Sequence, residues 1–103
     1  MNSSEKTILQ MWVVGTMHTL IELGALKLRL PIPKLDEFTR EDYLSFYNSF
    51  PMPDYLVELA AESLLNRFFS EEEVETICRM LCAYKNDREA FLRRSLEALA
   101  VKG

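Results

Sequence analysis

The sequence is poor in glycine and cysteine, and each shortage argues against particular classes of protein. Its three glycines are Gly15, Gly24 and Gly103, whereas β-sandwiches and barrels need many turn glycines. Phosphate-binding loops and nucleophile elbows also require glycines at fixed spacings, and no such motif is present. The two cysteines, Cys78 and Cys82, are too few for a disulfide framework and favour a reducing compartment.

The sequence also lacks a strong basic charge and a long apolar run. Its formal net charge is -4, from 12 basic and 16 acidic residues, whereas nucleic-acid modules usually carry a basic excess. The uncharged run over residues 7–21 is shorter than the ~20 apolar residues of a membrane span. The residues after the first methionine lack the pattern of a secretory leader, in which a positively charged region precedes an apolar region and a small-residue cleavage site. We therefore expect a cytoplasmic protein without a membrane span.

What remains is a helical pattern over residues 1–103, which we interpret as one domain. The spacing of apolar residues predicts an all-α protein, a small orthogonal or irregular bundle of about five helices. The predicted ranges are 4–24, 39–50, 54–68, 70–84 and 86–101. Proline pairs separate the first three of these helices, and Gly24 is a candidate C-cap. Residues 25–30 stay open between helix, strand and coil, because apolar and basic residues alternate there.

Two helix starts have clear local signals. Ser70 is followed three residues later by Glu73, which predicts a capping box at the start of the fourth helix. Thr39 is a good N-cap for the second helix, and Phe38 and Tyr43 occupy the two positions of a hydrophobic staple.

Apolar stripes predict which faces of the later helices are buried. In the fourth helix the predicted core face includes Val74, Ile77, Cys78, Leu81 and Cys82. In the third helix the stripe that we expect to face inward is Tyr55, Leu56, Leu59, Ala60, Ser63, Leu64 and Phe68.

Few residues have side chains suited to catalysis or metal binding. His18 is the single histidine, and Glu22, one turn later, could assist it as a base. Cys78 and Cys82 could supply two ligands to a metal, but zinc usually takes four. We interpret all of these as structural residues, and the glutamates around Glu73 as a helix cap with a solvated face. The sequence therefore predicts no catalytic, cofactor or metal site and no enzyme.

The leading hypothesis is a non-enzymatic, partner-binding accessory protein, such as a regulator, inhibitor, adaptor or chaperone. The first helix is apolar over so much of its circumference that we expect four short helices to be insufficient to cover it. We expect it to be buried in a homodimer or against another protein. Methionine and aromatic residues suit such surfaces, and the candidate contacts are Met11, Trp12, Met17, Tyr47, Phe50, Met52 and Tyr55.

The alternative is a DNA-binding regulator. Arg88, Arg93, Arg94 and Lys102 form a basic patch on the predicted last helix, which with the preceding helix could make a helix-turn-helix. Interspersed glutamates and the acidic total make nucleic acid the less favoured partner.

Overall fold

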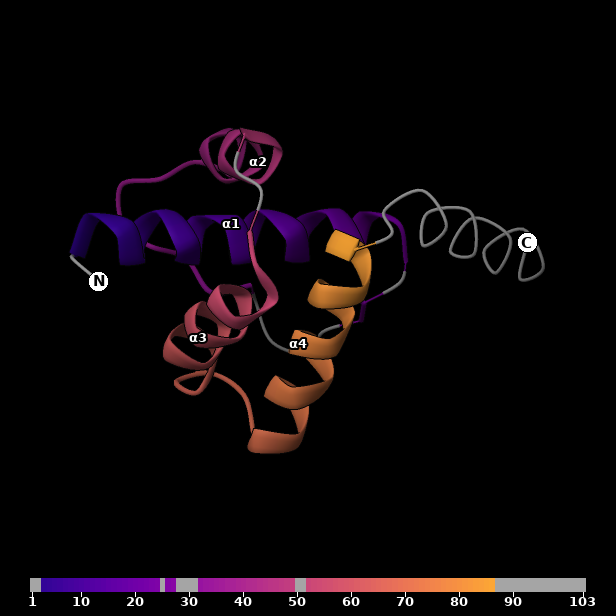
Figure 1. Ribbon diagram of the computed structural model, residues 1–103. Helices are drawn as coiled ribbons and strands as arrows, with labels where there is room; N and C mark the ends of the chain where they lie inside the picture. Colours follow the sequence, from indigo (N-terminus) through magenta and orange to yellow (C-terminus); the bar gives the residue numbers. More distant parts are fainter. Residues whose placement is uncertain (1–2, 25, 28–31, 50–51, 87–103) are drawn as a thin grey trace.

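The computed structural model describes residues 3–24, 26–27, 32–49 and 52–86 and confirms an all-α fold (Figure 1). The helices are α1 (Ser3–Glu22), α2 (Arg40–Ser49), α3 (Asp54–Leu65) and α4 (Glu71–Asn86), and the described part contains no strand. Four helices here are compatible with a bundle of about five. The fifth helix that the sequence predicts lies outside the described residues. In the part of the chain that the structure describes, no helix is both long and apolar enough to cross a membrane.

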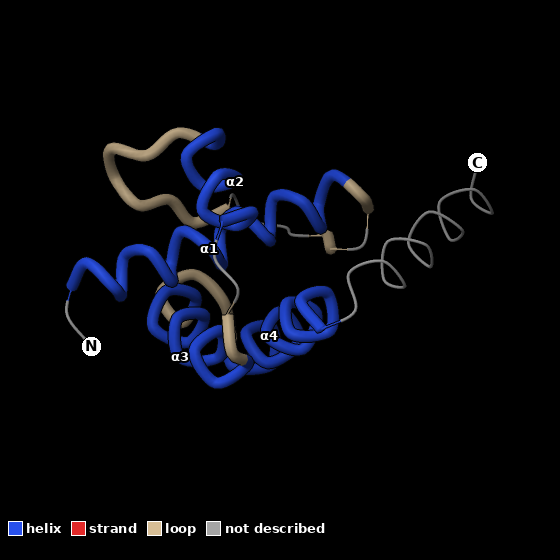
Figure 2. The backbone as a smooth tube through the Cα atoms, turned by 45° about the horizontal axis from the view of Figure 1, so that its top comes forward, coloured by secondary structure: helices blue, strands red, loops and turns tan. Residues whose placement is uncertain are grey.

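The helix α1 lies in the middle of the molecule. Figure 1 shows α2 on one side of α1 and the pair α3 and α4 on the other side, and Figure 2 shows α3 and α4 side by side. A helix covered on two sides can be apolar round most of its circumference. The chain's own elements therefore bury α1, and a second chain is not needed to cover it.

The packing of α1 against α2 depends on a close approach at Gly15. A Cβ atom at this position would overlap the carbonyl oxygen of Tyr43 and would lie 2.9 Å from Cβ of Tyr47. A side chain of any size would thus push α2 away from α1. The ring of Tyr47 also packs against Trp12 with a centroid distance of 5.9 Å.

Hydrogen bonds confirm the predicted starts of α2 and α4. At α4, Ser70 N–H donates to Glu73 Oε1 at 3.1 Å, and Glu73 N–H donates to Ser70 Oγ at 3.3 Å. At α2 the same reciprocal pair joins Thr39 and Asp42, at 2.9 and 3.2 Å. These bonds satisfy N–H groups that a helix start leaves without an intrahelical partner.

The segment after α1 begins with a C-cap. Gly24 has a φ of 75°, the left-handed conformation that glycine adopts without steric cost. Leu26 N–H then donates to Leu20 O at 3.2 Å, and the Leu26 side chain is buried. Leu26 and Lys27 are neither helix nor strand, while the rest of the ambiguous stretch lies mostly outside the described residues.

The predicted core face of the third helix is confirmed at Ala60 and Leu64, which are buried, and is wrong at three other positions. Tyr55, Leu59 and Phe68 are exposed, with relative exposures of 64%, 52% and 42%. The buried residues of α3 are Val57, Ala60, Ala61, Leu64 and Leu65, so the core face is rotated from the predicted one toward Val57, Ala61 and Leu65. Both stripes are apolar in the sequence, but only the buried one carries both alanines, Ala60 and Ala61, which allow α3 to pack closely against α1 and α4.

Candidate functional site

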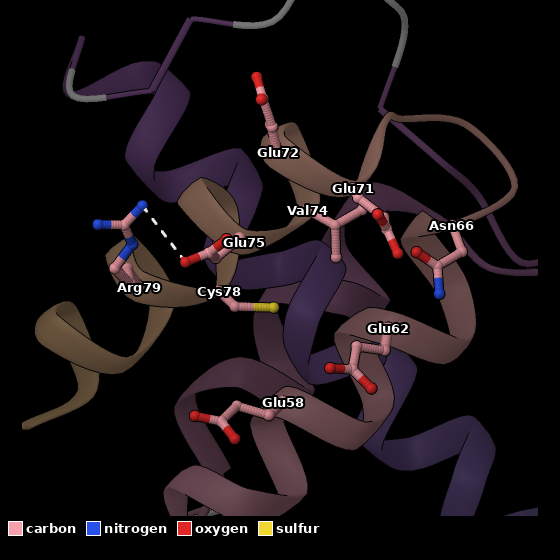
Figure 3. A pocket seen from close by; sticks show the side chains of 9 residues that line it. All are labelled: Glu58, Glu62, Asn66, Glu71, Glu72, Val74, Glu75, Cys78 and Arg79. Carbon is pink, nitrogen blue, oxygen red and sulfur yellow. Dashed lines mark ion pairs between the residues drawn. The ribbon is translucent and has the colours of Figure 1, made fainter.

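A groove between α3 and α4 has a volume of about 760 Å³ (Figure 3). Five of its nine lining residues are glutamates, and one is an arginine. The full lining consists of Glu58, Glu62, Asn66, Glu71, Glu72, Val74, Glu75, Cys78 and Arg79. The groove is therefore strongly acidic.

Local structure explains why so many carboxylates meet here. The capping box at Ser70 places Glu71 and Glu72 in the first turn of α4, where the helix dipole favours negative charge. From α3, Glu58 and Glu62 are one turn apart and face the same side. The arginine compensates this charge weakly, because Arg79 pairs with Glu75 at 3.8 Å and both side chains are exposed.

The other end of the α3–α4 seam is neutralised. Lys85 Nζ lies 2.7 Å from Asp54 Oδ1, and Asn86 Nδ2 donates to Asp54 Oδ2 at 3.0 Å. The hydrogen bond from Lys85, followed by that from Asn86, lowers the pKa of Asp54. The uncompensated negative charge is thus concentrated toward the α3–α4 turn.

The two cysteines lie along this seam as thiols. Cys78 is buried and Cys82 is half-buried, and neither forms a disulfide. Burial, followed by the nearby Cys82 and the carboxylates of Glu62 and Glu58, raises the pKa of Cys78 to about 11. Burial is also the first cause of the raised pKa of Cys82. Such thiols are poor nucleophiles at neutral pH, because the thiolate is the reactive form.

The described residues contain no group of three histidine, cysteine or acidic side chains placed to hold a metal ion. Glu22, which the sequence offered as a helper for His18, instead forms an ion pair with Arg40. The ring of His18 stacks on that of Tyr43, with a centroid distance of 6.1 Å and an interplanar angle of 28°.

A second cavity of about 370 Å³ surrounds His18, between the C-terminal half of α1 and the start of α2. In contrast to the groove, its cationic side chains are Lys34 and Arg40, and none of the described residues lines it with a carboxylate. Burial, then Arg40 and then Lys34, lower the pKa of His18. The full lining is His18, Ile32, Lys34, Phe38, Thr39, Arg40 and Tyr43.

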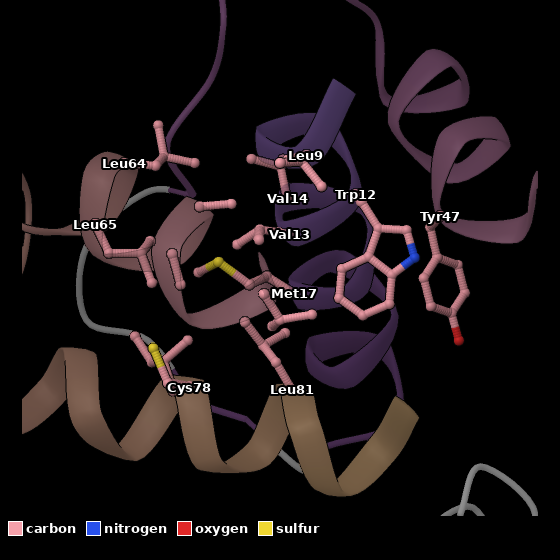
Figure 4. Packing of buried hydrophobic residues seen from close by; sticks show 14 of the residues in the cluster. Leu9, Trp12, Val13, Val14, Met17, Tyr47, Leu64, Leu65, Cys78 and Leu81 are labelled. Carbon is pink, nitrogen blue, oxygen red and sulfur yellow. The ribbon is translucent and has the colours of Figure 1, made fainter. Parts of the chain in front are cut away.

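The candidate partner contacts fall into three groups. Met11, Trp12, Met17, Tyr47 and Met52 are buried within the chain; Figure 4 shows Trp12 packed on Tyr47, and Met17 among residues of α3 and α4. A partner could not contact these five side chains in this structure, whereas they were selected as candidates because we expected them to be accessible. Tyr55 is exposed on α3. Phe50 lies outside the described residues.

The basic residues of the DNA-binding alternative, Arg88, Arg93, Arg94 and Lys102, also lie outside the described residues. That alternative stays a prediction.

Sequence reasoning did not identify Glu58, Glu62 or Leu59 as surface features of interest. A helical projection centred on Tyr55 would have placed all three on its side of the helix, because they follow it at positions i+3, i+7 and i+4. Lys34 and Arg40 have no such local signal, since only the chain fold brings them to His18.

A comparison with known proteins finds no matching family model, no matching curated protein and no matching solved structure.

Proposed function

We propose that this chain is a non-enzymatic binding module, such as a regulator, inhibitor, adaptor or chaperone, that recognises another protein through α3. The observation that carries this proposal is the exposure of Tyr55 and Leu59, which are one helical turn apart. Together with Glu58 and Glu62 they form a continuous stripe, which we call the α3 stripe. Aromatic and large aliphatic side chains of this kind commonly supply the central contacts of protein interfaces.

The apolar part of the α3 stripe continues toward α1. Leu56 lies three positions before Leu59, and it lines a shallow depression of about 200 Å³ with Ile8 and Leu9 of α1. An apolar side chain of a partner would fit this depression. On the opposite edge, the α3 stripe borders the acidic groove, because Glu58 and Glu62 belong to both.

Charge and apolar surface together define the chemistry of the partner. A basic amphipathic segment would place its apolar side chains on Tyr55 and Leu59 and its lysines or arginines over the groove, and such charge complementarity favours encounter and specificity. Two copies of the same acidic groove would repel one another. The expectation of a homodimer rested on α1, which the chain itself covers, so we propose a different protein as the partner.

We place the protein in a reducing compartment such as the cytoplasm, which the unpaired thiols of Cys78 and Cys82 support.

The test compares three immobilised proteins as baits for extracts of the source cells: the wild type, a Tyr55→Ser/Leu59→Ser double variant and Phe68→Ser. Phe68 is an exposed aromatic residue beyond the end of α3, so its variant is the matched control. We expect a partner that the wild type and the control retain, that the double variant loses, and that high salt releases. Equal recovery on all three baits would contradict the proposal.

Two further measurements make that result interpretable. Thermal unfolding should be nearly the same for all three proteins, because exposed substitutions usually change stability by less than about 0.5 kcal/mol. Light scattering should show a monomer. A wild-type dimer that the double variant dissociates would identify a second copy as the occupant of the α3 stripe, contrary to the proposal of a different protein.

A further inference from the structure

The cavity around His18 has the features of a small-molecule site, separate from the proposed protein-binding face. It lies between α1 and α2, whereas the α3 stripe faces away on another element. Its volume of about 370 Å³ is within the range of roughly 300–1,000 Å³ typical of ligand pockets. Such pockets combine apolar walls with a few convergent polar groups.

The walls of this cavity are fixed by hydrogen bonds. The Tyr43 hydroxyl donates to Leu35 O at 2.9 Å and accepts from Leu35 N–H at 2.7 Å. This pair of hydrogen bonds between Tyr43 and Leu35 ties the loop before α2 to α2 itself. The capping box of Thr39 and Asp42 fixes the start of α2 and hence the position of Arg40. A preformed site loses less conformational freedom on binding than a mobile one.

The basic groups of the cavity come from three segments. His18 belongs to α1, Lys34 to the loop, and Arg40 to the first position of α2. Lys34 and Arg40 are the charges that act on His18, and both disfavour its protonation. Glu22 pairs with Arg40, but a guanidinium has five N–H donors and can bind a second carboxylate. The nearby carboxylates Asp36 and Asp42 act on Tyr43 and do not line the cavity.

The remaining walls are apolar. Ile32 and Phe38 are half-buried, and the ring of Tyr43 is buried beneath the imidazole of His18. Phe38 also contacts Tyr43, with a centroid distance of 6.3 Å. An inorganic anion would leave these surfaces in water, whereas a ligand with a flat or short apolar body would cover them.

We propose that this cavity binds a small organic carboxylate, with its carboxylate beside Lys34, Arg40 and His18 and its apolar body against Ile32 and Phe38. The bound carboxylate offsets the positive charges of Lys34 and Arg40, which otherwise disfavour protonation of His18. This site does not depend on the protein partner proposed above.

The single histidine of the chain is a direct probe. The ring signals of His18 would be followed by NMR during titrations with sodium benzoate, benzyl alcohol and sodium phosphate at constant ionic strength. Benzoate should shift the signals saturably and raise the pKa of His18, because a bound anion stabilises the imidazolium form. Benzyl alcohol lacks the charge and phosphate lacks the apolar body, so each should bind at least about tenfold more weakly.

Variants identify where the benzoate binds. Lys34→Gln should weaken benzoate binding roughly fivefold, the loss expected for one partly exposed charge contact, and Arg40→Gln provides an independent second variant. Lys6→Gln, which removes an exposed lysine in the first turn of α1, is the matched control and should bind as the wild type does. Far-UV circular dichroism should be the same for all variants.

Three outcomes would overturn the proposal. Benzoate that produces no saturable shift of the His18 signals would exclude the site. Phosphate or benzyl alcohol binding as tightly as benzoate would exclude the ligand class. Unchanged benzoate affinity in both Lys34→Gln and Arg40→Gln would exclude the cavity as the place where it binds.

Discussion

The close contact between α1 and α2 at Gly15 makes the substitution Gly15→Ala informative. Glycine in the middle of a helix normally destabilises it, and replacement by alanine stabilises a helix by about 1 kcal/mol. At this position the new methyl group would overlap the carbonyl oxygen of Tyr43 and lie 2.9 Å from its carbonyl carbon and from Cβ of Tyr47. Because these atoms belong to or adjoin the backbone, α2 must shift as a body to make room.

The magnitude follows from these two opposing effects. Extra methyl groups in a well-packed core cost about 1–3 kcal/mol, and contact with a rigid backbone places this case near the upper limit. Subtracting the gain in helix propensity leaves a net loss of about 2 kcal/mol in the free energy of unfolding. For a domain of this size, such a loss lowers Tm by roughly 10 °C.

Urea unfolding followed by tryptophan fluorescence measures this loss. Trp12 is the single tryptophan of the chain, and it is buried against Tyr47 on the same α1–α2 interface. Asn48→Ala, on an exposed position of α2, is the control and should stabilise the protein by about 0.5 kcal/mol through helix propensity alone. A Gly15→Ala protein as stable as the wild type, or more stable, would refute the close packing of α1 and α2.

Three further predictions concern a cap and two titratable groups. Ser70→Ala removes the N-cap of α4 and should lower the free energy of unfolding by about 1 kcal/mol, whereas Ser45→Ala on α2 should not; equal urea midpoints would contradict this. Because the pKa of Cys78 is raised to about 11, iodoacetamide at neutral pH should modify it slowly until the protein is unfolded, as counted by mass spectrometry. The pKa of His18 is lowered from 6.5 in the folded protein, so its contribution to stability is present above pH 6.5 and is lost as the pH falls through the folded-state pKa. His18→Gln should show a smaller loss of stability over that range, and an identical pH profile would count against the burial of this imidazole.

The cavity around His18 combines parts that the sequence indicates and parts that it does not. Thr39 and Tyr43 carry clear local signals as cap and staple, so the start of α2 could be predicted. The neighbours of His18 could not, because Lys34 and Arg40 are 16 and 22 positions away. Helical spacing pointed to Glu22 as its helper, but that carboxylate pairs with Arg40 instead.

The third helix shows the limit of periodicity. The sequence of α3 contains two apolar stripes, one through Tyr55 and Leu59 and the other through Val57, Ala61 and Leu64. Periodicity establishes that the segment is helical, but it does not choose between two stripes of similar hydrophobicity. The choice depends on which stripe fits closely against α1 and α4, and the alanine-rich one does.

By itself the sequence determined the helical class of the described part and where α2 and α4 begin. Capping boxes, proline breaks and the glycine after α1 act over a few residues, so their hydrogen bonds and steric limits are already present in the local chain. Only the tertiary structure decided how α1 is covered, which stripe of α3 stays exposed, and that five glutamates line one groove while basic residues gather at another. Those features require segments far apart in the chain to meet, and the packing of whole helices decides which of them do.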